Sequence, residues 1–141
     1  MNLALSTTLH TSFDEAVKLT RGALAGQGFG VLAEINVKET LKAKLGEDME
    51  DYLILGACNP PLAHRAIGVN RQIGTLLPCN VVVRADPERD GTIIIEAMNP
   101  QMMADVTGEP MLVPIAEEVS GKLKAVIGEL ENSSVANPSQ V

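Results

Sequence analysis

The order of hydrophobic and polar residues follows two periods along this chain, and each period predicts a different kind of element. Several stretches have the alternation or the dense aliphatic content of β-strands. They cover Asn2–His10, Phe29–Val37, Tyr52–Cys58, Cys79–Asp86 and Thr92–Met98. The third is apolar at almost every position, which is typical of a central strand. The last two flank a turn that ends in Asp-Gly, so they predict a hairpin.

Helical spacing of the apolar residues predicts most of the remaining elements. Ser12 and Glu15 have the spacing of a capping box, and a helix that ends near Gly26 follows them. Asn59, followed by two prolines, predicts a second helix start, because Asn is a favoured N-cap and Pro is tolerated in the first turn. The other predictions are helices at Lys38–Leu45 and from about Val113 to Leu130, a return loop at Gly74–Pro78, and a long loop at Asn99–Pro114 with a helical turn at Gln101–Asp105.

The pattern has the extent of one domain. A chain of 141 residues can bury a core without disulfide or metal support. Neither an internal repeat nor a linker divides it. We therefore predict a single domain over residues 1–131, followed by a flexible polar tail over residues 132–141.

Composition and net charge disfavour several classes of binding partner. Hydrophobic residues make up 45% of the chain and aromatic residues 2%, so the core is aliphatic and aromatic platforms for stacking bases are absent. A formal net charge of −7, with scattered Lys and Arg, disfavours nucleic acid and anionic lipid. Apolar runs fall short of the ~18 residues that a membrane span needs, and the N-terminus lacks the features of a signal peptide. We expect a cytoplasmic protein that binds neither nucleic acid nor membranes.

Cys58 is the main candidate for chemistry. If Asn59 caps a helix, the thiol of Cys58 lies just before that helix, where unpaired N–H groups and the helix dipole stabilise a thiolate. Such a thiol serves as a nucleophile, a redox group or a soft-metal ligand. The alternative is that Cys58 is an inert buried side chain at the end of a strand.

Other residues are candidates for chemistry, either together with Cys58 or as metal ligands through their own sulfur atoms. Cys79 would share a disulfide or a metal with Cys58 if their Cα atoms lie within ~7 Å; otherwise it is a core thiol. His64 would act with Cys58 as a nucleophile pair or as a metal or haem ligand, or else it is an ordinary surface or packing histidine. Met98 and Met102, with Met103 and Met111, would bind Cu(I), or simply fill space.

Several enzyme signatures are missing from the chain. It has no G-x-S-x-G, no phosphate-binding G-x-x-x-x-G-K, no G-x-G-x-x-G and no Cys/His metal signature. The sequence therefore favours a non-enzymatic role and indicates no particular cofactor.

Three ordered motifs resemble a known family. They are Gly56-Ala57-Cys58-Asn59-Pro60-Pro61-Leu62-Ala63, Leu77-Pro78-Cys79-Asn80-Val81 and Ala97-Met98-Asn99-Pro100. Together they are similar to the domain-of-unknown-function 302 family over about residues 1–130. Asn99 stands where the family often has Asp, and Pro61 replaces a commonly basic residue.

The resemblance implies a fold and an assembly. Similar proteins are compact α+β domains with a mainly antiparallel sheet, helices packed on one face, and a homodimeric state. The family has no established activity, so Cys58, Asn59, Pro60, Pro78 and Cys79 carry over as pattern positions only.

Three functional hypotheses follow from these observations. The first is a homodimeric binding or regulatory domain whose small ligand lies near Cys58, Asn59, Pro60, His64, Cys79 and Asn80. The second is a thiol-dependent enzyme or redox protein that uses Cys58. The third is a haem or soft-metal carrier that uses Cys58, His64, Cys79, Met98 or Met102.

Overall fold

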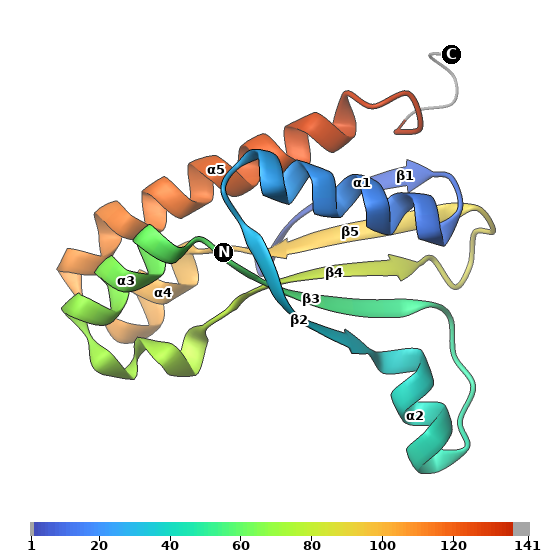
Figure 1. The fold of residues 1–141 in the computed structure, drawn as a ribbon, viewed down its shortest axis with the longest axis horizontal. Helices are drawn as coiled ribbons and strands as arrows, with labels where there is room; N and C mark the ends of the chain where they lie inside the picture. The colour runs from blue at the N-terminus through green and yellow to red at the C-terminus, as the bar shows by residue number, and fades with distance from the viewer. Residues whose placement is uncertain (1, 137–141) are drawn as a thin grey trace.

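A five-stranded antiparallel sheet forms the framework of the computed structural model, which describes residues 2–136 (Figure 1). The order across the sheet is β1-β5-β4-β3-β2. The strands are β1 (Ala4–His10), β2 (Gly30–Asn36), β3 (Tyr52–Cys58), β4 (Cys79–Ala85) and β5 (Thr92–Met98). The predicted strands and the predicted hairpin of β4 and β5 are confirmed, and the apolar β3 lies inside the sheet between β4 and β2.

Two helices begin at the predicted caps, Ser12 and Asn59, and the segment predicted as a long loop is more helical than expected. Ser12 accepts a hydrogen bond from the N–H of Glu15 at 3.1 Å, as the capping box predicts. The segment Asn99–Pro114 was predicted as a long loop with a helical turn at Gln101–Asp105, and it is mostly helical. The helix α4 ends where Gly108 adopts a left-handed conformation, and η2 begins at Pro110. The helices are α1 (Phe13–Gly26), α2 (Val37–Leu45), α3 (Pro60–Val69), α4 (Gln101–Thr107) and α5 (Val113–Glu131), with 3-10 turns η1 (Arg71–Leu76) and η2 (Pro110–Leu112).

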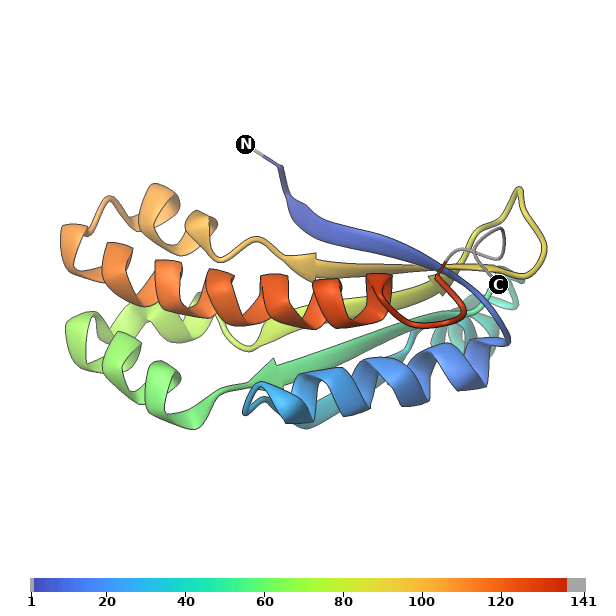
Figure 2. The ribbon, with the colours of Figure 1, turned by 90° about the horizontal axis from the view of Figure 1, so that it is seen from above.

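One face of the sheet carries the core. Alternate residues of the central strands point to it, among them Leu55 on β3, Val81 on β4 and Ile95 on β5, which are almost fully buried. The helices α1 and α5 lie side by side over this face (Figure 2). The α+β fold with an antiparallel sheet is thus confirmed.

The opposite face of the sheet, which we call the bare face, consists of Ile35, Tyr52, Ile54, Val82, Arg84, Ile94 and Glu96. Neither α1 nor α5 covers it. Its apolar residues on the central strands are half-buried, and Arg84 donates to Glu96 at 2.7 Å between them. The helix α2 projects from the sheet on this side (Figure 1), and none of its residues 37–45 is buried. The expectation that the helices pack on one face therefore holds for α1 and α5 but not for α2.

A second group of helices lies beyond the end of the sheet where β3 and β5 finish and β4 begins (Figure 1). We call α3, η1, α4, η2 and the first half of α5 the end cluster. Because α5 is 19 residues long, its first half belongs to this cluster and its second half packs on α1 and β1. The sheet and the end cluster meet around Cys58 and Cys79.

The predicted flexible tail is partly attached to the domain. The N–H of His10 donates to the carbonyl oxygen of Val135 at 2.6 Å, and Val135 and Ala136 pack against the core. These contacts arise because α5 ends beside β1. Residues 137–141 of the predicted tail lie outside the described residues. Between residues 2 and 136, no helix is long and apolar enough to cross a membrane.

Candidate functional site

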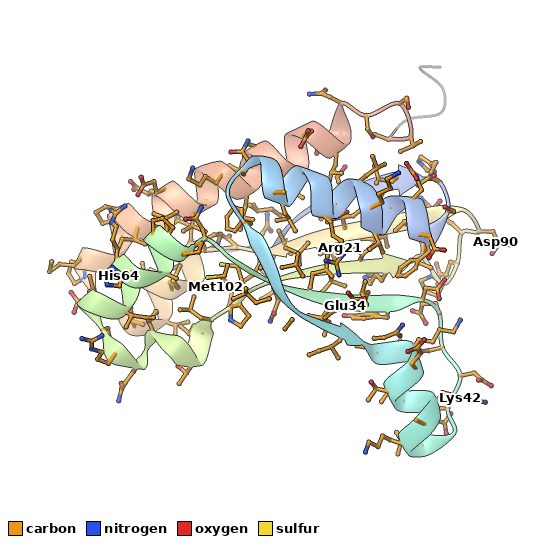
Figure 3. The ribbon with its side chains drawn as sticks, in the orientation of Figure 1. Arg21, Glu34, Lys42, His64, Asp90 and Met102 are labelled. Atoms are coloured by element: carbon orange, nitrogen blue, oxygen red, sulfur yellow. The ribbon has the colours of Figure 1, made fainter. Side chains whose placement is uncertain are left out.

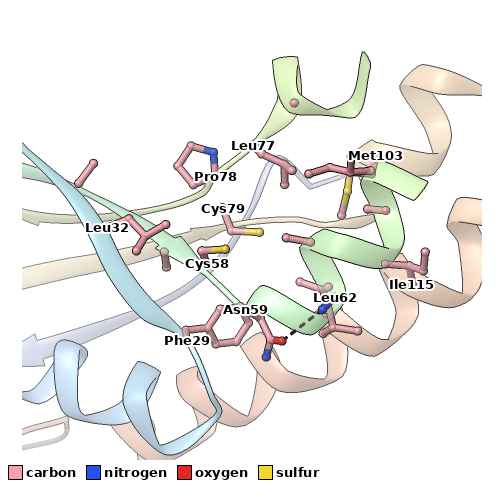
Figure 4. Close-up of a pocket in the computed structure, with 17 residues that line it drawn as sticks. Phe29, Leu32, Cys58, Asn59, Leu62, Leu77, Pro78, Cys79, Met103 and Ile115 are labelled. Atoms are coloured by element: carbon pink, nitrogen blue, oxygen red, sulfur yellow. Dashed lines mark hydrogen bonds between the residues drawn. The ribbon is translucent and has the colours of Figure 1, made fainter. Parts of the chain in front are cut away.

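A cavity of about 460 Å³ lies where the end cluster meets the sheet (Figure 4). Its walls come from the start of β2, the end of β3, α3, the connection from η1 to β4, α4 and α5. Among the described lining residues none carries a charge, and Asn59 supplies the single amide. The residues are Phe29, Leu32, Ala33, Ala57, Cys58, Asn59, Leu62, Ala63, Ala66, Ile67, Gly74, Leu77, Pro78, Cys79, Met103, Ile115 and Val119.

The connection from η1 to β4 is held against β3 by Pro78. The peptide bond between Leu77 and Pro78 is cis. A Cβ atom at Gly56 would lie 2.9 Å from Cγ of Pro78, so only glycine leaves room for the ring at this position. This contact places Leu77, Pro78 and Cys79 along one wall of the cavity.

Asn59 joins two helices at the edge of the cavity. Its Oδ1 accepts the N–H of Leu62 at 3.5 Å, which confirms the predicted N-cap of α3. Its Nδ2 donates to the carbonyl oxygen of Gln27 at 3.4 Å, just after the end of α1. Gly28, with φ of 82°, passes beside this amide. Asn59 therefore fixes the position of α3 relative to α1, which the local sequence pattern did not indicate.

Both thiols border the cavity. Cys58 is half-buried, and Cys79 is 6% exposed. Burial raises the pKa of Cys79 from 9.0 to about 11, and the neighbouring Cys58 adds to this rise because two adjacent thiolates would repel each other. Cys79 is therefore a protonated thiol at neutral pH.

Three other predicted site residues lie away from the cavity walls. His64 is exposed on α3 (Figure 3), because the cavity takes the helix face formed by Leu62, Ala63, Ala66 and Ile67. Pro60 is exposed at the first position of α3. Asn80 is exposed because side chains alternate along β4 and Cys79 takes the buried side. The structure does not bring His64 and Cys58 together on the cavity wall.

The methionines differ in burial and in whether they line the cavity. Met103 on α4 is buried and lines the cavity, whereas the sequence pattern indicated it only as a member of the methionine group for Cu(I). The predicted helical turn at Gln101–Asp105 contains Met103, but the prolines and glycine around this segment favoured a surface loop. Met98 and Met102 are half-buried and are not among the described lining residues. Across residues 2–136, no group of three His, Cys, Asp or Glu side chains is placed to hold a metal ion.

The chain is similar to known proteins over almost its whole length. The model of the family described as domain of unknown function DUF302 matches residues 5–130. The crystal structure of an uncharacterized conserved protein DUF302 from Bacillus stearothermophilus matches with a TM-score of 0.83. The two chains are 30% identical, and the match covers 92% of this chain and 99% of the other. No curated protein matches. The fold, the three motifs and these matches together show that the chain belongs to the DUF302 family.

Proposed function

We propose that the protein is a homodimeric binding domain that takes one small apolar molecule in the cavity beside Cys58 and the start of α3. The observation that carries this proposal is the cavity of about 460 Å³, which lies within the range of roughly 300–1,000 Å³ typical of small-molecule sites. Such sites have mostly apolar walls and a few polar groups that orient the ligand. The thiols and the amide of Asn59 are polar groups of this kind.

The lining residues favour an uncharged ligand. Burying an isolated charge in an apolar cavity is costly, and the described lining residues offer no opposite charge. The amide of Asn59 already binds Leu62 and Gln27, so one further donor position and one further acceptor position are the most that it adds. A largely hydrocarbon molecule with at most one neutral polar group fits these walls.

We place the opening of the cavity at the β-bulge in β2. The register between β2 and β3 shifts between Val31 and Ala33, which leaves Leu32 as the extra residue. Leu32 lines the cavity and is also 73% exposed, so its side chain lies between the cavity and solvent. Bulges often occur next to binding and active sites because they redirect a side chain.

The same walls support binding rather than catalysis. General-base catalysis through Cys58 would need a base within hydrogen-bond distance. His64 is on the exposed side of α3, carboxylates are absent from the described lining residues, and Cys79 holds its proton. We place the protein in the cytoplasm, where its two free thiols would stay reduced.

Binding of the neutral fluorescent probe N-phenyl-1-naphthylamine tests the cavity. The chain has no Trp and one Tyr, so the probe signal has little protein background. We expect one probe per chain, and we expect Ala63→Phe to abolish binding by filling the cavity. His64→Phe is the matched control, since it adds the same ring one residue later on the exposed side of α3. Equal binding by both variants would refute the proposed site.

The homodimer is supported by the exposed apolar side chains of β2 and α2. Ile35 on the bare face is 51% exposed, and Leu45 on α2 is 67% exposed. A helix such as α2, without a buried residue, gains stability mainly by packing on a partner. A second copy placed on the bare face would cover these residues and would meet a neutral surface, because Arg84 and Glu96 already pair.

The mass in solution tests the dimer. We expect the native protein to sediment at twice the mass of one chain, and Ile35→Glu to sediment as a monomer because the new charges would face each other in the interface. Val106→Glu is the control, since Val106 is a comparably exposed residue on α4, away from the bare face. A monomeric native protein, or a dimer unaffected by Ile35→Glu, would contradict this part of the proposal.

A further inference from the structure

The register of the sheet places the two cysteines close together. Ala57 on β3 pairs with Cys79 on β4, and Cys58 is the next residue after Ala57. Paired residues of antiparallel strands have Cα atoms about 5 Å apart, and one further residue adds about 3.3 Å along the strand. The Cα atoms of Cys58 and Cys79 are therefore about 6 Å apart, which is within the span of disulfides.

Both side chains reach the cavity because each lies at a strand end. In continuous strands, alternation would put Cys58 and Cys79 on opposite faces of the sheet. However, β3 ends at Cys58 and β4 begins at Cys79, so the cavity extends past both strand ends. Both cysteines line the cavity, and Figure 4 shows their side chains next to each other.

We propose that Cys58 and Cys79 are a redox-sensitive thiol pair, in which Cys58 reacts first with a small disulfide and Cys79 then closes a disulfide at the cavity wall. Cys58 is the half-buried thiol of the two, so it meets the reagent first. We also propose that this disulfide changes the affinity of the cavity for its ligand. That part rests on the proposed function, whereas formation of the disulfide does not.

Each step balances. The Cys58 thiolate attacks one sulfur of a small, uncharged disulfide, a new S–S bond forms, and one small thiolate leaves and takes up a proton. The Cys79 thiolate then attacks the Cys58 sulfur and releases the second small thiol. The protein loses two protons and two electrons, and the reagent takes them up and is reduced to two thiols.

The second step is the slow one. Burial, the larger cause of the raised pKa of Cys79, remains when Cys58 carries the adduct, so few molecules carry the Cys79 thiolate at neutral pH. Cys58 is the titratable group that faces Cys79 in the cavity; the other described lining residues, from β2, α3, α4 and α5, do not titrate. The mixed disulfide on Cys58 should therefore accumulate at pH 7 and close faster as the pH rises, by about tenfold per pH unit below the pKa.

The experiment follows intact mass after addition of 2-hydroxyethyl disulfide to the reduced native protein at several pH values. We expect one mercaptoethanol adduct, mapped to Cys58, that converts to an internal disulfide at a rate rising with pH. Cys79→Ala should stop at the adduct, and Cys58→Ala should react much more slowly than the native protein. Because the native protein alone gives both species, the result does not depend on the folding of the variants.

Several outcomes would overturn the proposal. They are an adduct that never closes at any pH, first modification at Cys79, or equal reactivity of Cys58→Ala and the native protein. Probe binding separates the two proposals. If the reduced protein fails to bind the probe, the proposed function fails while the disulfide is still judged by mass. If the disulfide forms but the probe affinity changes by less than about tenfold, the pair does not regulate the cavity.

Discussion

The ring of Pro78 occupies the space that a side chain at Gly56 would need, since a Cβ there would lie 2.9 Å from Cγ of Pro78. The same Cβ would lie 3.3 Å from Cβ of Ala33 on the other neighbouring strand. Gly56 is thus enclosed from both sides, and the position of the cavity wall depends on its lack of a side chain.

We predict that Gly56→Ala destabilises the protein by about 1–3 kcal/mol, because the added methyl group forces Pro78 or Ala33 to move. Gly30→Ala is the control in the neighbouring strand, where nothing lies within 4 Å of the added Cβ. Urea unfolding of both variants measures the difference. Equal stability of the two would show that Pro78 shifts freely.

Removal of the Asn59 side chain should weaken the junction of α1 and α3. Asn59→Ala loses the cap of Leu62 and the bond to Gln27, and we expect a loss of about 1–2 kcal/mol in urea unfolding. Asn59→Asp keeps an acceptor for the cap but not the donor to Gln27, so its loss should be intermediate.

The matched control is Asn36→Ala. Asn36 caps α2 through the N–H of Glu39 at 3.0 Å, and residues 37–45 of that helix contribute nothing to the buried core. Its loss should therefore fray α2 with little change in global unfolding. If Asn36→Ala lowers the free energy of unfolding as much as Asn59→Ala does, the hydrogen bond from Asn59 to Gln27 adds nothing to the stability of the protein.

Stability should fall in alkaline solution because of Cys79. Its pKa in the folded protein is about 11 against 9.0 for the free thiol, so the folded state favours the protonated form. The protonated thiol keeps its full contribution below pH 9, and that contribution is lost as the pH rises from about 9 to 11. The change from 9.0 to about 11 corresponds to about 2.7 kcal/mol at most.

Urea unfolding between pH 8 and pH 11 measures this dependence, with Cys79→Ala as the comparison. The two proteins share every other titrating group, so the difference between their pH profiles isolates Cys79. We expect the native profile to fall more steeply. Parallel profiles would mean that the thiolate of Cys79 is solvated in the folded state.

The residues after α5 should contribute to the stability of β1. A chain that ends at Glu131 loses the carbonyl of Val135 that accepts from His10, and it uncovers the core beside Val135 and Ala136. We predict that it is less stable than a chain that ends at Ala136 by about 1 kcal/mol or more, measured by thermal unfolding. Identical unfolding of the two chains would place the domain boundary at Glu131, as the sequence pattern alone predicts.

The helix caps and strands that depend on residues close together in the chain could be predicted from the sequence. The capping box at Ser12, the N-cap at Asn59 and the period-two strands all arise from local contacts, and the structure confirms them. Only a helical turn at Gln101–Asp105 was predicted within α4, because the prolines and glycine around it are typical of loops, although they only set its ends.

The cavity could not be predicted in the same way. The bond from Asn59 to Gln27 joins residues 32 positions apart, and Met103 reaches the cavity from α4, far along the chain from Cys58. His64 was a candidate only because it is close to Cys58 in sequence, and helical rotation places it on the exposed side of α3. The closeness of Cys58 and Cys79 required the register of β3 and β4, which the connection through Pro78 sets.

The continuity of α5 makes distant parts of the molecule mechanically dependent. Ile115 and Val119 form one wall of the cavity, and Leu130 lies fully buried near the other end of the same helix. Because these residues lie on one continuous helix with buried contacts near both ends, a shift at its first turns should also change the contacts at its last turn. A ligand that displaces Ile115 should therefore also alter the packing at the end of α5, near the hydrogen bond between His10 and Val135. Amide hydrogen exchange in the last turn of α5 should then differ between the ligand-bound and the ligand-free protein.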